Sequence, residues 1–211
     1  MGPSVYNWTG CYAGVQAGWG WGTSKFSDPS GTAFAPPGQN LTVSPQGALV
    51  GGQVGCDYQF SGRWVAGIEV ADAYADITRG GLSDPFFSNK SDLNAKTNQL
   101  GSATARLGYG WDRVLLYGKG GGAWAHNTYD VNKSFAGIVT DFSGSDTRFG
   151  WTAGAGIEWA FATNWSAKAE FNYYDLGSTT LNLVGGGSTL PATIKQQFET
   201  ATIGVNYRFG H

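Results

Sequence analysis

The stretch that decides the fold is FGWTAGAGIEWAF, residues 149–161. Its odd-numbered positions carry Phe, Trp, Ala and Ile, whereas its even-numbered positions carry Gly, Thr, Ala and Glu158. Alternation with a period of two is typical of a β-strand, because successive side chains point to opposite faces. In a water-soluble barrel the large apolar rings fill the interior, but here the small and polar residues share the second face. The stretch therefore predicts a strand whose apolar face contacts lipid.

The same alternation recurs in seven further stretches of the chain. Tight turns at 61–63, 112–113 and 162–164 alternate with long polar connections. This order is typical of an outer-membrane barrel, whose short turns lie in the periplasm and whose long loops lie outside the cell. We predict an all-β fold, an eight-stranded antiparallel up-and-down transmembrane β-barrel, with strands at 8–22, 47–60, 64–78, 99–111, 114–128, 148–161, 165–176 and 195–209, and loops at 23–46, 79–98, 129–147 and 177–194.

The composition fits a small membrane barrel. The chain has 34 Gly, 9 Trp, 10 Tyr and 12 Phe but only 13% charged residues, unlike an ordinary soluble domain. One barrel domain accounts for residues 1–211, with 1–7 and 210–211 as flanking segments. The formal net charge of −2 gives no basic surface for nucleic acid. Because such a barrel is exported on a signal peptide, we expect that a leader has been removed and that Met1-Gly2 and Gly210-His211 derive from cloning.

Aromatic residues cluster where each predicted strand would cross a membrane surface. Amphipathic rings favour the headgroup boundary, so these residues predict two girdles. The alternative is that the rings form the core of a soluble ligand carrier, but the opposite face is too polar to form an apolar pocket. The predicted girdle residues are Trp19, Trp21, Tyr58, Phe60, Trp64, Trp111, Trp124, Trp151, Trp159, Phe161, Trp165, Tyr207 and Phe209.

Charged residues share the inward parity and predict an ion-pair network in the lumen. A barrel of eight strands has room only for its own side chains, and a buried charge is tolerated only when it is paired. We therefore expect a sealed polar plug; the alternative is a narrow pore in which ion pairs exchange partners. Asp57 and Glu69 are expected to face Arg106 and Lys119, while Glu158 and Glu170 share the lumen with Lys168 and Arg208.

The sequence offers no catalytic, metal or cofactor site. Glu69, Glu158 and Glu170 have no accompanying nucleophile or substrate pocket, and His126 has no Ser or Cys partner in sequence reach. The glycine run at 118–122 lacks the spacing of a phosphate-binding loop. We expect a protein that is not an enzyme.

Cys11 and Cys56 have outward parity near the short-turn ends of the first two strands. In the register where paired residue numbers add to 67, the two cysteines lie opposite each other, close enough for a disulfide. The oxidising periplasm permits the bond. The alternative is two small residues that face lipid without a bond.

Asp72 and the outer loops are the remaining features. Strand parity would point Asp72 into lipid, which is costly, so a bulge near Ala71-Asp72 is expected. Aromatic residues stand beside prolines at 34–37 and in Asp84-Pro85-Phe86-Phe87, a combination that suits contact with a host surface, a phage or a neighbouring barrel. The alternative is that these are variable tips.

The sequence resembles the small opacity-protein-like, porin-family outer-membrane barrels of alphaproteobacteria. The matching motifs are WTGCYAG (8–14), GIE (67–69), RLGYGWDRVLLY (106–117), GWTAGAGIE (150–158) and NWSAK (164–168). Cys11, Cys56, the order Ala71-Asp72 and the trailing Gly210-His211 depart from the family pattern.

The resemblance implies a bacterial outer-membrane location with loops facing the cell exterior, in contact with membrane lipid and lipopolysaccharide. It also implies insertion by the barrel-assembly machinery through the C-terminal strand, where Ile203, Val205, Tyr207 and Phe209 alternate. The expected function is a structural barrel that supports envelope integrity and presents surface loops. The alternatives are a narrow passive porin and a surface receptor or adhesin for host molecules or haem.

Overall fold

The computed structural model describes residues 6–27, 40–79, 91–135, 138–185 and 188–209, most of which form β-strands. None of these residues belongs to a helix long and apolar enough to span a membrane. The strands are β1 (Gly10–Ser27), β2 (Asn40–Val43), β3 (Gln46–Phe60), β4 (Trp64–Arg79), β5 (Ser91–Trp111), β6 (Val114–Phe135), β7 (Ile138–Ala160), β8 (Trp165–Gly185) and β9 (Ser188–Phe209).

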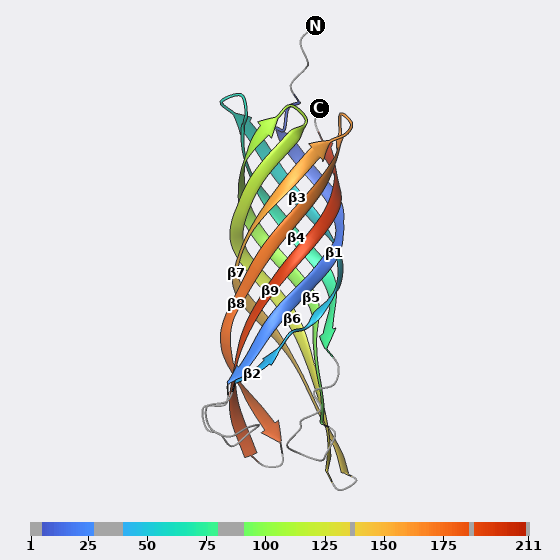
Figure 1. Ribbon diagram of the computed structural model, residues 1–211, viewed down its shortest axis with the longest axis vertical. Coiled ribbons are helices and arrows are strands. Elements are labelled where there is room, and N and C mark those ends of the chain that lie inside the picture. Colours follow the sequence, from blue (N-terminus) through green and yellow to red (C-terminus); the bar gives the residue numbers. More distant parts are fainter. Residues whose placement is uncertain (1–5, 28–39, 80–90, 136–137, 186–187, 210–211) are drawn as a thin grey trace.

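Eight of these strands close into an antiparallel barrel (Figure 1). Each strand pairs with its neighbour in the order β1, β3, β4, β5, β6, β7, β8 and β9, and β9 returns to pair with β1. The short strand β2 pairs only with the far end of β1, where Ser24 lies opposite Val43. The predicted eight-stranded up-and-down barrel is confirmed.

One end of the barrel carries the short turns and both chain termini (Figure 1), and we call it the short-turn end. The turn after β3 uses Ser61 and Gly62 with φ of 49° and 75°, and the turn after β5 uses Asp112 with φ of 51°. Hairpin turns need such left-handed residues, because their backbone twist then matches the twist of the strands. The tight turns fix the register of the neighbouring strands.

The opposite end, the long-hairpin end, differs from the sequence expectation. Residues 129–147 and 177–194 were expected as polar loops, but β6 and β7 continue to residues 135 and 138, and β8 and β9 to residues 185 and 188. The expectation is wrong because polar residues and glycines make up most of these segments, as in loops, whereas their backbones pair as strands. The aromatic and proline residues at 34–37 and 84–87 lie outside the described residues.

Neighbouring glycines on β6 differ in the space around them. A Cβ on Gly121, which has inward parity, would lie 2.1 Å from the Ala103 carbonyl oxygen and 2.8 Å from Thr104 Cα. A Cβ on Gly122, which has outward parity, would meet nothing within 4 Å. The lumen-side position therefore requires glycine for the close approach of β5, whereas the lipid-side position does not.

We expect Gly121→Ala to lower the free energy of unfolding by about 1–3 kcal/mol, because rigid backbone atoms must move. Gly122→Ala, one residue away on the same strand, is expected to stay within about 0.5 kcal/mol of the parent. Urea unfolding in lipid vesicles, followed by tryptophan fluorescence, measures both. Equal midpoints for the two variants would contradict the steric explanation.

The interior contains two apolar clusters. The first lies toward the long-hairpin end and consists of Leu49, Ala73, Ala75, Ile77, Leu100, Ala123, Ala125, Tyr174, Leu176 and Phe198. The second lies at the short-turn end and consists of Tyr6, Trp8, Val65, Leu115, Tyr117 and Ala160. Between them, the inward positions of the same strands carry the charged residues.

Candidate functional site

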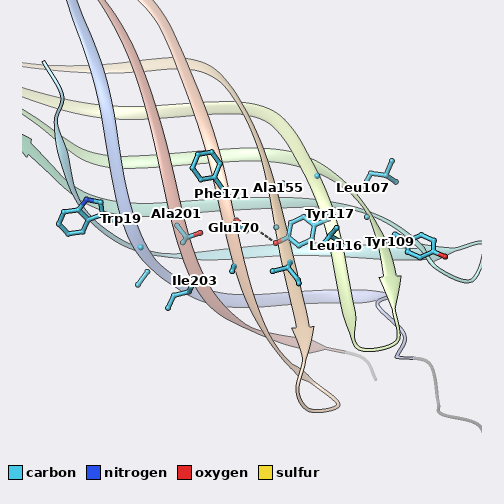
Figure 2. Close-up of a pocket in the computed structure, with 18 of the residues that line it drawn as sticks. Trp19, Leu107, Tyr109, Leu116, Tyr117, Ala155, Glu170, Phe171, Ala201 and Ile203 are labelled. Atoms are coloured by element: carbon cyan, nitrogen blue, oxygen red, sulfur yellow. Dashed lines mark hydrogen bonds between the residues drawn. The ribbon is translucent and has the colours of Figure 1, made fainter. Parts of the chain in front are cut away.

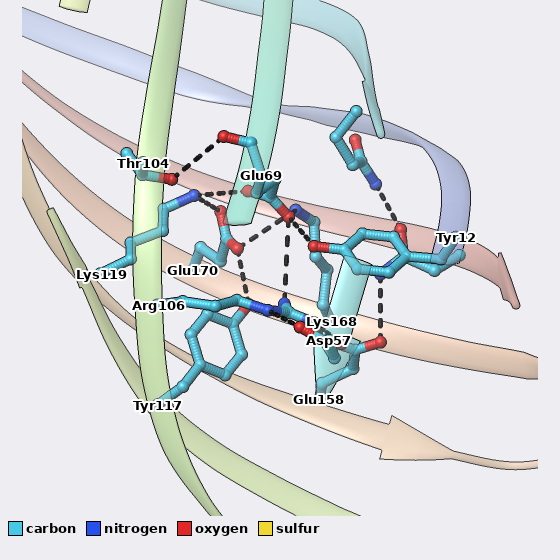
Figure 3. A network of polar contacts seen from close by, with 12 residues as sticks. Tyr12, Asp57, Glu69, Thr104, Arg106, Tyr117, Lys119, Glu158, Lys168 and Glu170 are labelled. Atoms are coloured by element: carbon cyan, nitrogen blue, oxygen red, sulfur yellow. Dashed lines mark hydrogen bonds and ion pairs between the residues drawn. The ribbon is translucent and has the colours of Figure 1, made fainter. Parts of the chain in front are cut away.

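The strands bring all eight predicted lumen charges together in one layer. Figure 3 shows how Arg106, Lys119 and Lys168 lie among the carboxylates. Four are acids and four are bases, so their formal charges cancel. Their side chains are at most 3% exposed. Such complete burial requires every charge to have a partner, because an isolated ion in this setting costs several kcal/mol.

Arg106 on β5 is the centre of one half of the layer. Its Nε donates to Asp57 Oδ1 at 2.7 Å, and its Nη2 pairs with Asp57 Oδ2, so the guanidinium binds this carboxylate in a bidentate manner. Its Nη1 lies 3.3 Å from Glu158 Oε2. The guanidinium also lies 4.7 Å from the ring centre of Tyr12 and 4.9 Å from that of Tyr117. A planar guanidinium matches both a carboxylate and two aromatic faces, which a lysine would not.

Two lysines organise the other half of the layer. Lys119 Nζ lies 2.9 Å from Glu69 Oε1 and 2.7 Å from Glu170 Oε2. Lys168 Nζ lies 3.1 Å from Glu69 Oε2 and 3.1 Å from Glu170 Oε1. Each lysine therefore bridges the same two carboxylates, and Arg106 Nη1, 3.9 Å from Glu69 Oε2, connects this half to the first.

The ion pairs differ from those expected from the sequence, because each of the two expected groups of four charges makes contacts with the other group. Asp57 was expected to face Arg106 and Lys119, but it binds Arg106 and Arg208, whose Nη2 is 2.9 Å from Asp57 Oδ2. Glu158 and Lys168 are direct neighbours across β7 and β8, yet Lys168 binds Glu69 from across the lumen. The long side chains reach across the barrel, so the layer ties opposite walls together.

Three hydroxyl groups donate further hydrogen bonds to the buried carboxylates. Tyr12 Oη donates to Glu69 Oε2 at 2.9 Å, and Tyr117 Oη donates to Glu170 Oε1 at 2.5 Å. Ser166 Oγ donates to Glu158 Oε1 at 2.5 Å. Sequence reasoning left these three donors out of the network. Inward parity could have found them, because Tyr12 shares the face of Gln16, Tyr117 that of Lys119, and Ser166 that of Lys168.

The segment before β1 closes the lumen at the short-turn end. Trp8 was expected to begin the first strand, but β1 begins at Gly10, and the Trp8 side chain is fully buried in the barrel mouth. Arg208 Nη1 donates to the Trp8 and Gly10 carbonyl oxygens at 2.5 and 3.1 Å. Tyr6 Oη donates to the Thr163 carbonyl oxygen at 3.0 Å. Residues 6–9 thus lie across the mouth, and the Trp8 carbonyl contacts the charged layer through Arg208.

A small void lies between the charged layer and the apolar cluster of the long-hairpin end. Lys119, Glu170, Leu49 and Tyr174 are among its lining residues, and its volume is about 10 Å³. A cavity needs roughly 10–15 Å³ by this measure to hold one water molecule. The void therefore has space for one water at most.

The outer wall carries the predicted girdle. Twelve of the thirteen predicted residues have exposed side chains, and edge-to-face contacts join Trp165 to Tyr207 and Tyr207 to Phe209. Trp124 is the thirteenth residue, and its side chain is only half-exposed. It lies over Gly101, and its Nε1 is 3.3 Å from Asp72 Oδ2.

Asp72 keeps the outward parity, and β4 pairs without interruption through this residue. The expected bulge at Ala71-Asp72 is therefore wrong in position, since the register shift lies further along, between Tyr74 and Ile77. Gln99 Nε2 donates to both Asp72 oxygens at 2.9 Å. These donors satisfy the carboxylate in place of a bulge.

Cys11 and Cys56 lie opposite each other across β1 and β3, with a Cα–Cα distance of 3.9 Å, and form a disulfide. Both side chains are on the lipid-facing wall. The bond links β1, which closes the barrel by pairing with β9, to its other neighbour β3.

A family model described as an outer membrane protein β-barrel domain matches residues 3–209. The chain belongs to the outer membrane β-barrel family. It is 32% identical over 210 residues to the 31 kDa outer-membrane immunogenic protein of Brucella melitensis biotype 1, covering 97% of this chain and 85% of that protein. It is 26% identical to the 25 kDa outer-membrane immunogenic protein of Brucella abortus biovar 1, covering 97% and 80% of the two chains.

A solved structure shows the same fold as this outer membrane β-barrel. The outer membrane protein OprG from Pseudomonas aeruginosa matches with a TM-score of 0.53 at 13% identity, covering 98% of this chain and 99% of that one. The predicted family and the predicted outer-membrane location are confirmed.

Proposed function

We propose that this outer membrane β-barrel is a structural protein with a closed lumen, which supports the envelope and presents its long hairpins to the cell exterior. The observation that carries the proposal is the neutral layer of eight buried charges between two apolar clusters. Moving a hydrated solute through this lumen would break several ion pairs at once. A stiff, closed barrel adds strength to the membrane and gives no passage through it.

The orientation and the partners follow from the same design. Short turns at the periplasmic side and long hairpins outside are the usual arrangement of bacterial barrels. The Brucella relatives are named immunogenic proteins, which supports display of the hairpins at the surface. We propose that the barrel-assembly machinery recognises β9, where Ile203, Val205, Tyr207 and Phe209 alternate on the lipid side. The proposal includes no catalytic role for the lumen carboxylates.

We expect the protein to give no conductance steps in planar lipid bilayers, because the paired charges of the lumen are almost fully buried and the void beside them holds one water at most. Insertion is checked in parallel by the shifted gel mobility of the folded barrel. Lys119→Ala, which removes a lumen side chain, and Val15→Ala, which trims the lipid-facing wall, form the matched pair. Reproducible steps in the parent that change with Lys119→Ala but not with Val15→Ala would establish a porin instead.

A further inference from the structure

A shallow groove on the lipid-facing wall is lined by residues of β1, β9, β8, β7, β6, β5 and β4, in the order in which these strands lie side by side (Figure 2). Its volume is about 1100 Å³ and it is open to the membrane along its length. Exposed apolar side chains such as Trp19, Phe171 and Leu116 form its edges, while Ala155 and Gly118 form its floor. Ala155 and Gly118 therefore form a shallow stretch between larger side chains.

One row of cross-strand partners runs the length of this groove. Consecutive register partners are Trp19, Ala201, Phe171, Ala155, Gly118 and Leu107, one on each of six neighbouring strands. Phe171 stands within this row, so the stretch with a small-residue floor runs from Phe171 over Ala155 and Gly118 to Leu107, about 14 Å at roughly 4.8 Å per strand. That length is close to the roughly 15 Å depth of one leaflet, half of the hydrocarbon core. A tilted acyl chain therefore fits within the groove.

The shallow floor is not a requirement of packing within the chain. A Cβ on Gly118 would meet nothing closer than the Gly154 carbonyl oxygen at 3.8 Å. Glycine within a strand costs stability and often marks a place where another molecule approaches closely. Gly118 thus keeps space open on the outside of the barrel.

The groove ends beside a cation at the short-turn end. Tyr109 and Trp64 line that end, and their rings pack edge to face at 5.5 Å. Arg63, on the exposed turn after β3, holds its guanidinium 6.0 Å from the Tyr109 ring centre, with Nη1 3.4 Å from Tyr109 Oη. Girdle aromatics mark the depth of lipid headgroups, so this guanidinium lies at the depth of a phosphate.

We propose that the groove binds one glycerophospholipid of the inner leaflet, with its phosphate on Arg63 and an acyl chain over Gly118 and Ala155. Guanidinium and phosphate form strong charge-assisted hydrogen bonds. The inference rests on the orientation proposed above, in which the short-turn end faces the periplasmic, phospholipid-rich leaflet. Lipopolysaccharide occupies the opposite leaflet and would place its phosphates at the long-hairpin end. A closed lumen is not required.

The test uses the full chain, freed of lipid in detergent and titrated with phosphatidylglycerol, with retained lipid counted by native mass spectrometry. We expect one lipid to remain bound to the parent. Arg63→Ala should weaken binding about fivefold, since one basic residue near a membrane surface contributes about that much. Gly118→Leu should abolish retention, because its side chain fills the floor from a position where a Cβ meets nothing closer than 3.8 Å.

Each variant has a matched control in the same chain. Arg113→Ala removes an arginine from the neighbouring short turn, and Gly122→Leu adds the same side chain to the same face of β6 outside the groove, where a Cβ meets nothing within 4 Å. Both controls should bind like the parent. If the gel mobility of Gly118→Leu shows that this variant does not fold, Ala155→Leu tests the groove floor in its place.

Three results would overturn the proposal: no retained phospholipid, equal losses in variants and controls, or preferential retention of lipopolysaccharide that Arg63→Ala leaves unchanged. Oligomers that disappear with Gly118→Leu while lipid binding does not change would assign the groove to a second copy of the chain instead. The conductance test addresses the lumen alone, so the closed-lumen proposal and this one fail by separate measurements.

Discussion

Replacing Arg106 with methionine is expected to lower the free energy of unfolding by about 3–5 kcal/mol, the usual effect of removing one partner from a buried ion pair. The substitution leaves Glu158 without its contact at 3.3 Å and Asp57 with Arg208 as its remaining cation. It also removes the guanidinium between the rings of Tyr12 and Tyr117. The neutral layer then carries an excess negative charge that water cannot reach.

Urea unfolding in lipid vesicles measures this loss. Arg113→Met, on an exposed turn, is the matched control and should change the free energy by no more than about 0.5 kcal/mol. The double variant Arg106→Met/Asp57→Asn restores neutrality, so it should lose less stability than the sum of its two single variants. Additive losses, or a loss no larger than that of Arg113→Met, would show that the layer does not act as one network.

Strand parity was enough to predict which side chains line the lumen. Alternation decides the face of each residue, so the inward positions of Asp57, Glu69 and Glu158 could be read from neighbouring apolar residues. Parity says nothing about which residue reaches which across the barrel. The contact of Lys168 with Glu69, at 3.1 Å, joins residues 99 positions apart and depends on barrel closure and strand tilt.

The ends of the barrel were harder to predict for a physical reason. Polar residues and glycines make up most of the hairpin extensions of β6 to β9, so their composition is that of loops although their backbones pair as strands. At the other end, the backbone leaves the ladder at Gly10, whose φ is 141°, and Trp8 turns into the mouth. A sequence pattern cannot distinguish a ring that faces lipid from one that folds back over the lumen.

Asp72 is a lipid-facing carboxylate in a strand that stays regular, although the sequence predicted a bulge near it. The rule that a lipid-facing carboxylate is costly predicted a distorted strand, yet the strand stays regular there. Gln99 and Trp124, on β5 and β6, supply the donors instead. Both partners are distant in sequence and become neighbours only through the pairing of β4, β5 and β6.

Removing the disulfide is expected to lower the free energy of unfolding by about 2–4 kcal/mol, because the bond reduces the conformational entropy of the unfolded chain. The bond spans 45 residues between Cys11 and Cys56. Cys11 also lies opposite Phe209 on β9, so the bonded position is part of the seam that closes the barrel. The bond therefore keeps the segments of β1 and β3 linked in the unfolded chain.

The pattern of three variants separates a bond from simple packing. With a bond, Cys11→Ala, Cys56→Ala and the double variant should all lose the same stability, because either substitution already removes the cross-link. Packing alone would not make the three losses equal, and the stability of the parent would then not depend on reductant. With a bond, reductant should lower the stability of the parent to that of the double variant and leave the double variant unchanged. Urea unfolding with and without reductant measures each comparison, and a parent whose stability reductant does not change would exclude the cross-link.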